Sequence, residues 1–233
     1  MTAPDRRRGP VPGSGTTLLV VAKEPAAGRV KTRLVPPCTP RQAADLAEAA
    51  LADTLHTVLA TPARRRVLVL DGEPGPWLPP GFDVMPQCGG GLDERLAGAF
   101  AAVSGPALLI GMDTPQLTPG LLTVDWEGAD AWFGPAADGG FWGLGLRVPE
   151  ATLVRGVPMS TADTGAVQLA RLHAAGLRVA ELPRLRDVDT AADAMAVACQ
   201  APLTRFAARA RELAPVLGLS APAHPARAAG GQP

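Results

Sequence analysis

The sequence predicts an α/β fold built on a mainly parallel sheet. Short apolar segments alternate with longer segments whose apolar residues have helical spacing, which is typical of parallel strands joined and covered by helices. With 233 residues the chain can bury a substantial core in one domain. The predicted strands are bounded by Gly, Pro or Asp, and they occupy residues 17–22, 67–71, 107–111, 130–134, 141–146 and 177–182.

Residues typical of helix starts precede several of the helical segments. Thr39 is expected to cap the first long helix, and Pro40 suits its first position. Ser160 and Thr190 are expected to cap two later helices. The later segments predicted to be helical are 92–103, a short one from 118, 160–176, 191–200 and one beyond 202. In parallel sheets connected by helices, ligands bind at the carboxyl ends of the strands, so the residues that follow each strand are the first candidates for function.

The two ends of the chain differ in composition from the rest. Residues 1–16 and 218–233 are rich in Pro, Gly, Ala and Arg and have no apolar periodicity. They are expected to be disordered tails on either side of a single domain at 17–217.

Charge and cysteine content exclude several classes of protein. Twenty-two basic and twenty-two acidic residues cancel, so no overall field predicts binding to nucleic acid or to an anionic membrane. The three cysteines are far apart, which is typical of a reducing compartment rather than of a disulfide framework or a zinc site. No apolar run is long enough for a signal peptide or a membrane span. The protein is therefore expected to be cytoplasmic.

The segment "AKEPAAGRVKTRL" at residues 22–34, which follows the first predicted strand, is the main candidate for anion binding. It contains both lysines of the chain, whereas the other twenty basic residues are arginines. Four cations within eleven residues suit a polyphosphate, which needs several converging positive charges. The alternative is a solvated basic turn, and neither the P-loop nor the Rossmann glycine motif is present. The candidate nucleotide-binding residues here are Ala22, Lys23, Gly28, Arg29, Lys31 and Arg33.

Three aspartates are candidates for a metal site. Asp113 lies just beyond the strand 107–111, and Asp187 and Asp189 lie between the last predicted strand and a helix. Mg²⁺ prefers oxygen ligands and commonly shares them with substrate phosphates. Each aspartate also has an ordinary structural interpretation, because Asp113 precedes a turn and Asp189 is placed where it could cap a helix. If Asp113 meets one of the later aspartates across the sheet, the pair makes a two-carboxylate site for Mg²⁺ or Mn²⁺.

Two glycine-rich segments are further candidates. The sequence Asp138-Gly139-Gly140 predicts a hairpin turn, and its glycines also leave room for a substrate beside Trp142. Gly91 directly precedes the helix at 92–103, whose free N–H groups can receive a base edge, and Arg95 is a further candidate for phosphate.

The chain resembles a bacterial glycosyltransferase-A-like family that is related to 2-phospho-lactate guanylyltransferase. The resemblance covers about residues 17–200 and is carried by six blocks in order: "VVAKEPAAGRVKTRL", "GLDERLAGAF", "LLIGMDTPQLTP", "GPAADGGFWGLGL", "VPMSTADT" and "DVDTAAD". It implies a three-layer α/β/α sandwich with a mainly parallel, Rossmann-like sheet, as in nucleotide-diphospho-sugar transferases (GT-A fold). Met159 departs from the pattern, since related sequences commonly have an aromatic residue at that position.

The resemblance also implies roles for individual residues. The basic loop would bind the di- or triphosphate, with Lys31 and Arg33 next to the leaving group. Asp113 and Asp189 would hold the metal. The substrate-binding residues that it implies or supports are Asp138, Gly139, Gly140, Trp142, Ser160 and Thr161.

These observations favour a magnesium-dependent transferase with a nucleotide donor. The leading hypothesis is nucleotidyl transfer from a nucleoside triphosphate to a small phosphorylated or carboxylated acceptor, with release of pyrophosphate. Only one carboxylate follows the central strand in "MDTP", where many sugar transferases have Asp-x-Asp, and this favours nucleotidyl transfer. The alternatives are sugar transfer from a nucleotide-sugar and a non-catalytic nucleotide-binding module.

Overall fold

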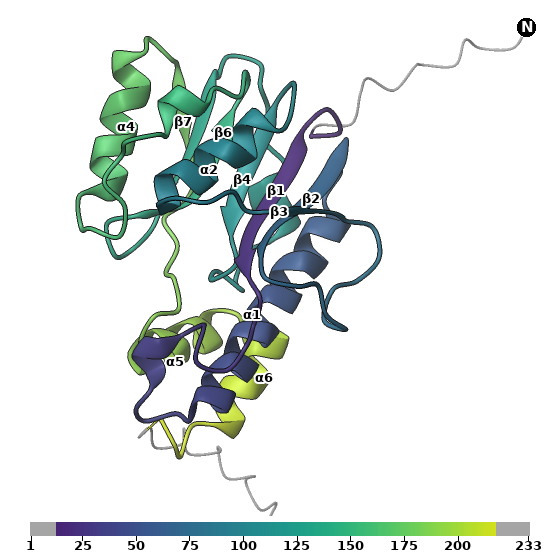
Figure 1. Ribbon diagram of the computed structural model, residues 1–233, viewed down its shortest axis with the longest axis vertical. Helices are drawn as coiled ribbons and strands as arrows, with labels where there is room; N and C mark the ends of the chain where they lie inside the picture. Colours follow the sequence, from purple (N-terminus) through teal and green to yellow (C-terminus); the bar gives the residue numbers. More distant parts are fainter. Residues whose placement is uncertain (1–12, 218–233) are drawn as a thin grey trace, which may run out of the picture.

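The computed structural model describes residues 13–217, which form a seven-stranded sheet with helices on both faces (Figure 1). The strand order is β3-β2-β1-β4-β6-β5-β7. Strand β6 is antiparallel to both of its neighbours, and every other neighbouring pair is parallel. The predicted α/β fold with a mainly parallel sheet is thus confirmed. The strands are β1 Thr17–Lys23, β2 Arg65–Asp71, β3 Asp83–Pro86, β4 Ala107–Gly111, β5 Ala131–Pro135, β6 Phe141–Leu146 and β7 Val179–Glu181.

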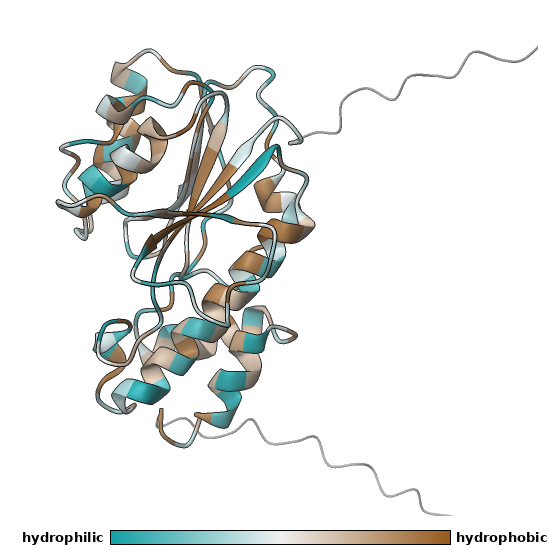
Figure 2. Cartoon of the chain, turned by 45° about the vertical axis from the view of Figure 1, so that its right-hand side comes forward, coloured by the Kyte–Doolittle hydropathy of each residue, from teal (hydrophilic) through white to brown (hydrophobic). Residues whose placement is uncertain are grey.

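Helices cover the sheet because alternate strand residues face opposite sides. In β1, Leu18 and Val20 pack in one apolar cluster with α1, whereas Leu19 packs in the opposite cluster with α2. Figure 2 shows the strands as largely hydrophobic, while the helices have one hydrophobic and one hydrophilic side. The helices are α1 Pro40–Ala60, α2 Leu92–Ala101, α3 Pro119–Leu122, α4 Thr164–Ala174, α5 Ala191–Gln200 and α6 Arg205–Glu212, with short 3₁₀ turns at Thr32–Leu34 (η1) and Ala151–Leu153 (η2).

A third apolar cluster lies below the sheet, where the first half of α1 packs against α5 and α6 (Figure 1). Phe206 is fully buried there, beside Leu46 of α1. The cluster includes Leu34 of η1 and Val188, which lie in the two loops that carry Lys31 and Asp189. Packing of the helices therefore fixes the position of both loops.

Two predicted helix caps are present as expected. The Thr39 hydroxyl accepts a hydrogen bond from the Gln42 N–H at 3.2 Å, and the Gln42 side chain accepts one from the Thr39 N–H at 2.8 Å. Thr190 and Asp193 form the same reciprocal pair at the start of α5. Because Thr190 caps this helix, the neighbouring Asp189 is available for another role.

Other predictions differ from the structure. Ser160 does not cap α4, which starts at Thr164 with Asp163 at the cap position. Ser160 has φ 59°, in the left-handed region, whereas the backbone of a capping serine is typically extended. The strand expected at 177–182 is shorter, and the edge strand β3 was not predicted at all.

The terminal residues complete the description of the chain. Residues 1–12 of the first expected tail and all of the second, 218–233, lie outside the described residues. Within residues 13–217, no helix is both long and apolar enough to cross a membrane.

Candidate nucleotide and metal site

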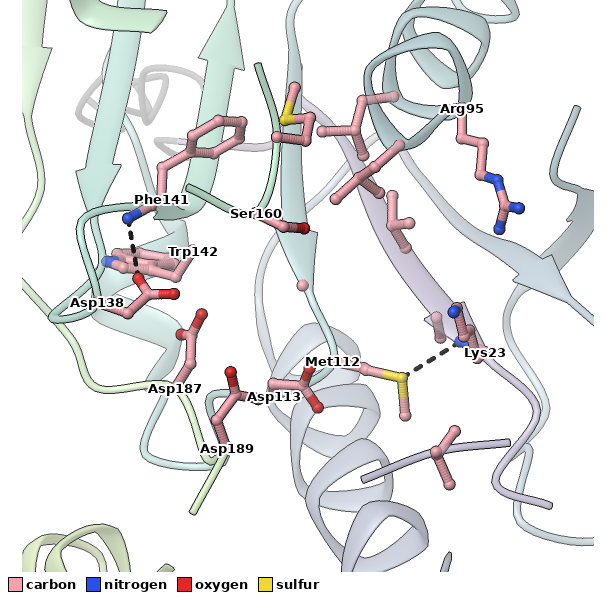
Figure 3. Close-up of a pocket in the computed structure, with 18 of the residues that line it drawn as sticks. Lys23, Arg95, Met112, Asp113, Asp138, Phe141, Trp142, Ser160, Asp187 and Asp189 are labelled. Carbon is pink, nitrogen blue, oxygen red and sulfur yellow. Dashed lines mark hydrogen bonds between the residues drawn. The ribbon is translucent and has the colours of Figure 1, made fainter. Parts of the chain in front are cut away.

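A pocket of about 430 Å³ opens at the edge of the sheet where β1, β2 and β4 end and β6 begins (Figure 3). This is the edge that the sequence pattern indicated, and the turn Asp138–Gly140 joins β5 to β6 there as the predicted hairpin. Most candidate residues line the pocket, but Gly28, Gly91 and Gly139 do not. The candidates that do are Ala22, Lys23, Arg29, Lys31, Arg33, Arg95, Asp113, Asp138, Gly140, Trp142, Ser160, Thr161 and Asp189.

Two hydrogen bonds bring the loop after β4 next to the loop before α5. The N–H of Val188 donates to the carbonyl oxygen of Asp113 at 3.1 Å. The side chain of Gln116 donates to the carbonyl oxygen of Arg186 at 2.7 Å. Asp113 is thereby held on the same side of the pocket as Asp187 and Asp189, which lie more than seventy residues later in the sequence.

Lys31 joins two of these aspartates. Its ammonium nitrogen lies 2.6 Å from Asp113 Oδ1 and 3.6 Å from Asp189 Oδ1. The lysine side chain is only 6% exposed. Arg33 binds the other oxygen of Asp189 at 2.7 Å, but its side chain is 70% exposed. Lys31 is therefore the buried counter-charge of the aspartates, and Arg33 is a solvated one.

Asp187 is the least compensated carboxyl of the group. Burial raises its pKa to about 7, and the negative charges of Asp113 and Asp138 add to the shift, whereas Lys31 opposes it. Its Oδ1 atom is buried and has no hydrogen-bond partner among the described residues. A buried oxygen without a donor is costly. The sequence left open whether Asp187 or Asp189 belongs to the site, and both line the pocket.

The raised pKa of Asp187 predicts a dependence of stability on pH. The ordinary pKa of an aspartate is 3.8, so the folded protein holds a proton that the unfolded chain releases. The stabilisation is complete below about pH 4 and is lost as the pH rises through about 7. Relative to Asp187→Asn, the wild type should lose on the order of 2 kcal/mol of unfolding free energy between about pH 5 and 8. Urea unfolding with a chelator present measures this, and parallel pH curves for the two proteins would contradict it.

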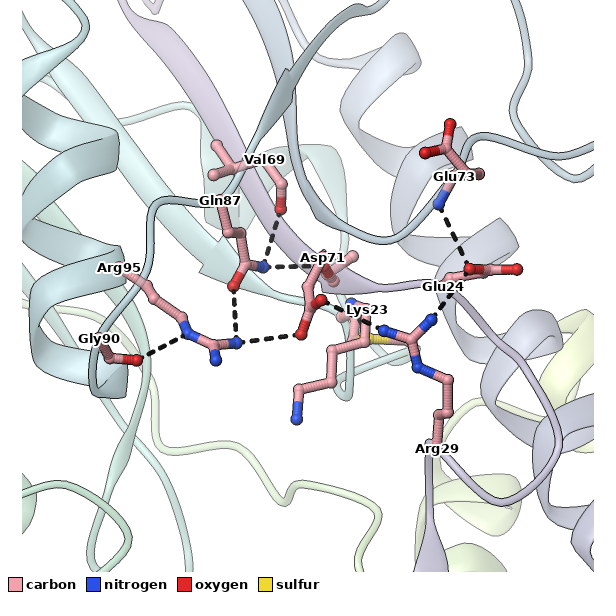
Figure 4. A network of polar contacts seen from close by, with 11 residues as sticks. Lys23, Glu24, Arg29, Val69, Asp71, Glu73, Gln87, Gly90 and Arg95 are labelled. Atoms are coloured by element: carbon pink, nitrogen blue, oxygen red, sulfur yellow. Dashed lines mark hydrogen bonds and ion pairs between the residues drawn. The ribbon is translucent and has the colours of Figure 1, made fainter.

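A second network, on the opposite side of the pocket, holds two guanidinium groups in place (Figure 4). The two carboxylate oxygens of Asp71 bind Arg29 at 3.3 Å and Arg95 at 3.0 Å. Glu24 binds Arg29 as well, and Gln87 accepts from Arg95 at 3.4 Å. Both arginines of this network, which are candidates for phosphate binding, are therefore already paired with carboxylates.

Lys23 differs from its neighbours in the basic loop. Its backbone N–H donates to the sulfur of Met112 at 3.2 Å, and its ammonium group has no ion pair within the described part of the chain. Its side chain is exposed and lines the pocket. Lys23 is thus available to an anionic ligand.

Asp71 and Gln87 were not among the site residues predicted from the sequence. A signal for Asp71 existed, because it is the last residue of β2 and stands level with Lys23 on β1. The rule that singled out Asp113 at the end of a strand applies equally to Asp71.

Apolar side chains form the remaining wall of the pocket. Phe141 and Met159 line it, so Met159 contributes to the wall although related sequences commonly have an aromatic residue there. The indole N–H of Trp142 donates to the carbonyl oxygen of Pro183 at 3.0 Å. Trp142 is only 2% exposed and packs in the core beneath the pocket.

Two strained backbone positions are found at the pocket. Among the described residues, Lys31 with φ 50° and Ser160 with φ 59° are the two non-glycine residues with positive φ. Both line the pocket. Strained backbone of this kind is concentrated at functional sites because surrounding structure must hold it there.

The carboxylates have the chemistry of a magnesium site but are not assembled into one. Among residues 13–217, no three His, Cys, Asp or Glu side chains converge closely enough to hold a metal ion. Asp113 and Asp189 nevertheless share one positive charge, and one oxygen of Asp187 has no donor among the residues that the structure describes. Two carboxylates suffice for Mg²⁺, which keeps several waters and shares ligands with phosphates. The residues present therefore fit the ion.

Solved structures share this fold. A protein from Desulfovibrio desulfuricans G20, described as a candidate nucleotide-diphospho-sugar transferase, is 25% identical with a TM-score of 0.78, over 88% of this chain and 97% of that chain. CMP:2-keto-3-deoxy-manno-octonic acid synthetase, solved with CTP, is 14% identical with a TM-score of 0.50, over 85% of this chain and 100% of that chain. The 2-C-methyl-D-erythritol 4-phosphate cytidylyltransferase of Thermus thermophilus is 18% identical with a TM-score of 0.49, over 82% and 99%.

The likeness to the Desulfovibrio protein confirms the nucleotide-diphospho-sugar transferase type of fold, whereas the relation to 2-phospho-lactate guanylyltransferase stays a prediction. No curated protein sequence matches the chain. One family model does match, and it covers residues 45–161, just over half of the chain. The chain therefore belongs to the family described as "Uncharacterized protein conserved in bacteria (DUF2064)".

Proposed function

We propose that the protein is a magnesium-dependent transferase that uses a nucleotide donor, and that its reaction is nucleotidyl transfer to a small phosphorylated or carboxylated acceptor. The observation that carries this proposal is the pairing of Lys31 with Asp113 and Asp189 at the pocket. A buried cation beside carboxylates that remain accessible from the pocket suits a site that handles both a metal ion and phosphates. The protein in the Desulfovibrio structure, whose description names a nucleotide-diphospho-sugar transferase, supports the same class of reaction.

The two sides of the pocket have different charges, and this separates the roles (Figure 3). Lys23 and Arg95 lie on the side of β1 and α2, where they face the nucleotide phosphates and ribose. Asp113 and Asp189 lie on the other side, where they would hold Mg²⁺ or Mn²⁺. When bound, the ion neutralises phosphate charge and polarises the α-phosphate. Asp138 and Ser160 border the space left for the acceptor.

The chemical step requires positioning rather than covalent help. An oxygen of the acceptor attacks the α-phosphorus of the triphosphate, and the bond to the β-phosphate oxygen breaks, so that pyrophosphate leaves with the electron pair. An ionised phosphate or carboxylate needs no general base. Lys31 and Arg33 balance the negative charge that develops on the leaving group. Such electrostatic stabilisation of the transition state is commonly the largest contribution that fixed side chains make to catalysis.

Sugar transfer from a nucleotide-sugar is the second candidate function. It is favoured by the description of the Desulfovibrio protein, which shares 25% of its residues with this chain. The same diphosphate and metal site would serve it. The two reactions differ in their leaving group, which is pyrophosphate in nucleotidyl transfer and a nucleoside diphosphate in sugar transfer.

Product analysis on the wild-type protein tests both candidates. Each nucleoside triphosphate and a set of nucleotide-sugars are first screened for a rise in melting temperature with and without Mg²⁺, because a ligand that binds only the folded state stabilises it. The donors that bind are then incubated with a panel of phosphorylated and carboxylated acceptors that includes 2-phospho-lactate. We expect one triphosphate to bind in a Mg²⁺-dependent manner and to release pyrophosphate. Release of a nucleoside diphosphate would support the second candidate instead, and Mg²⁺-independent binding with neither product would contradict both.

A further inference from the structure

Lys31 stands where a divalent cation would have to stand to bind Asp113 and Asp189 together. Its ammonium nitrogen contacts both carboxylates, at 2.6 and 3.6 Å. The aspartate side chains are 37% and 35% exposed, whereas the lysine is 6% exposed. The positive charge is thus enclosed, and the carboxylates remain accessible from the pocket.

The charges around Lys31 do not balance without it. Four carboxylates line this side of the pocket, and Arg33, the other cation bound to them, is largely solvated. Removing an enclosed positive charge from such a group leaves carboxylates that repel one another at short distance. The four are Asp113, Asp138, Asp187 and Asp189.

We propose that Lys31 is an internal counter-ion that occupies the metal position in the free protein and is displaced when a divalent cation binds. The inference rests on the metal site of the proposed function. The inference adds that the Lys31 ammonium group and the divalent cation compete for the same pair of carboxylates. The freed ammonium group then becomes available to an anionic ligand in the same pocket.

The chemistry of lysine suits this exchange better than that of arginine. An ammonium group is a compact charge on a flexible stem, whereas a guanidinium group makes two fixed parallel bonds to a carboxylate. The chain has twenty arginines and two lysines, and one of the two lysines is at this position. The 3.6 Å separation from Asp189 is too long for a hydrogen bond, so that part of the contact is electrostatic only.

Binding of Mn²⁺ to the nucleotide-free, full-length protein tests the proposal. Free Mn²⁺ is measured by its electron paramagnetic resonance signal, so that no catalytic activity is required. Lys31→Met removes the charge and keeps an aliphatic stem. We expect Lys31→Met to bind Mn²⁺ about tenfold more tightly than the wild type, because the ion no longer competes with a fixed positive charge. Equal or weaker binding than in the wild type would overturn the proposal.

The other lysine of the chain provides the matched control. Lys23 lines the same pocket but has no ion pair among the described residues. Lys23→Met should therefore change the Mn²⁺ affinity by less than about twofold, although it weakens nucleotide binding. If Lys23→Met gained as much Mn²⁺ affinity as Lys31→Met, the loss of any positive charge at the pocket would explain the gain, and the proposal would be overturned.

Two further variants keep the test decisive. Lys31→Asn suits the left-handed backbone at this position and replaces Lys31→Met if the latter fails to fold. Adding Asp113→Ala to the Lys31 variant should abolish the gain in affinity, and a gain that survives would overturn the proposal.

The inference and the proposed function fail in different ways. If the wild type releases pyrophosphate but the Lys31 variants bind Mn²⁺ no more tightly than the wild type does, only the inference about Lys31 is wrong. If the Lys31 variants bind Mn²⁺ more tightly but the wild type forms no nucleotide-dependent product, only the proposed function is wrong.

Discussion

Replacing Asp113 by alanine is expected to lower kcat/KM for nucleotide transfer by about a thousandfold or more. Asp113 is one of the two carboxylates that share the Lys31 ammonium group, and its backbone carbonyl accepts from Val188. The alanine variant keeps this backbone bond and loses only the carboxylate. Removal of one preorganised charged contact to a transition state typically costs a hundred- to a thousandfold in rate, and loss of a metal ligand adds to that. Steady-state assays of pyrophosphate release at several Mg²⁺ concentrations measure the effect.

A control variant separates this effect from general damage. Asp83 lies on the edge strand β3, pairs with Arg65 at the surface and does not line the pocket. Asp83→Ala should leave kcat/KM unchanged within about twofold, since exposed ion pairs contribute little. If Asp113→Ala retains wild-type activity while Asp83→Ala behaves as expected, the assignment of Asp113 to the metal site is wrong.

Replacing Gly139 by alanine is expected to lower the free energy of unfolding by about 3 kcal/mol or more. Gly139 has φ +92°, and a methyl group there would lie 2.0 Å from the carbonyl oxygen of Ala162. Its own carbonyl oxygen accepts from the Gly165 N–H at 2.8 Å. The contact is between two backbones, so no side-chain rotation relieves it. The β5–β6 turn and the start of α4 must therefore separate, and urea unfolding measures the loss.

Gly156 offers a matched comparison because it has positive φ without a close neighbour. Its φ is +79°, and an added methyl group would meet no atom of residues 13–217 within 4 Å. Gly156→Ala should therefore cost only the conformational strain, about 1 kcal/mol. The difference between the two variants isolates the steric clash, and equal losses would show that the clash is relieved.

The order of strands and helices was readable from the sequence because both faces of the sheet are covered. A strand such as β4 is apolar at nearly every position, and its predicted bounds agree with those of the structure. Strand β3 was missed for the opposite reason. It is a four-residue edge strand with three exposed positions and a proline, so it carries no apolar pattern.

The composition of the site was predictable, but its pairings were not. Asp113, Lys31 and Asp189 each follow an element in a way that the sequence shows. That one ammonium group joins the two aspartates depends on the pairing of β1 with β4 and on the hydrogen bond between Val188 and Asp113. Neither the strand pairing nor this hydrogen bond can be predicted from a single sequence. The role of Gly139 is similar, because Ala162 comes close only in the folded chain.

The scarcity of lysine has a practical consequence for reagents that react with amines. Apart from the amino terminus, the chain offers them only Lys23 and Lys31, and both line the pocket. Lys31 is enclosed by its carboxylates, whereas Lys23 is exposed. Ester-activated dyes and amine-coupled sensor surfaces will therefore attach at the mouth of the ligand pocket unless they capture the amino terminus. Fluorescent or immobilised samples for binding work should instead be attached through another group, such as the exposed thiol of Cys199, which does not line the pocket.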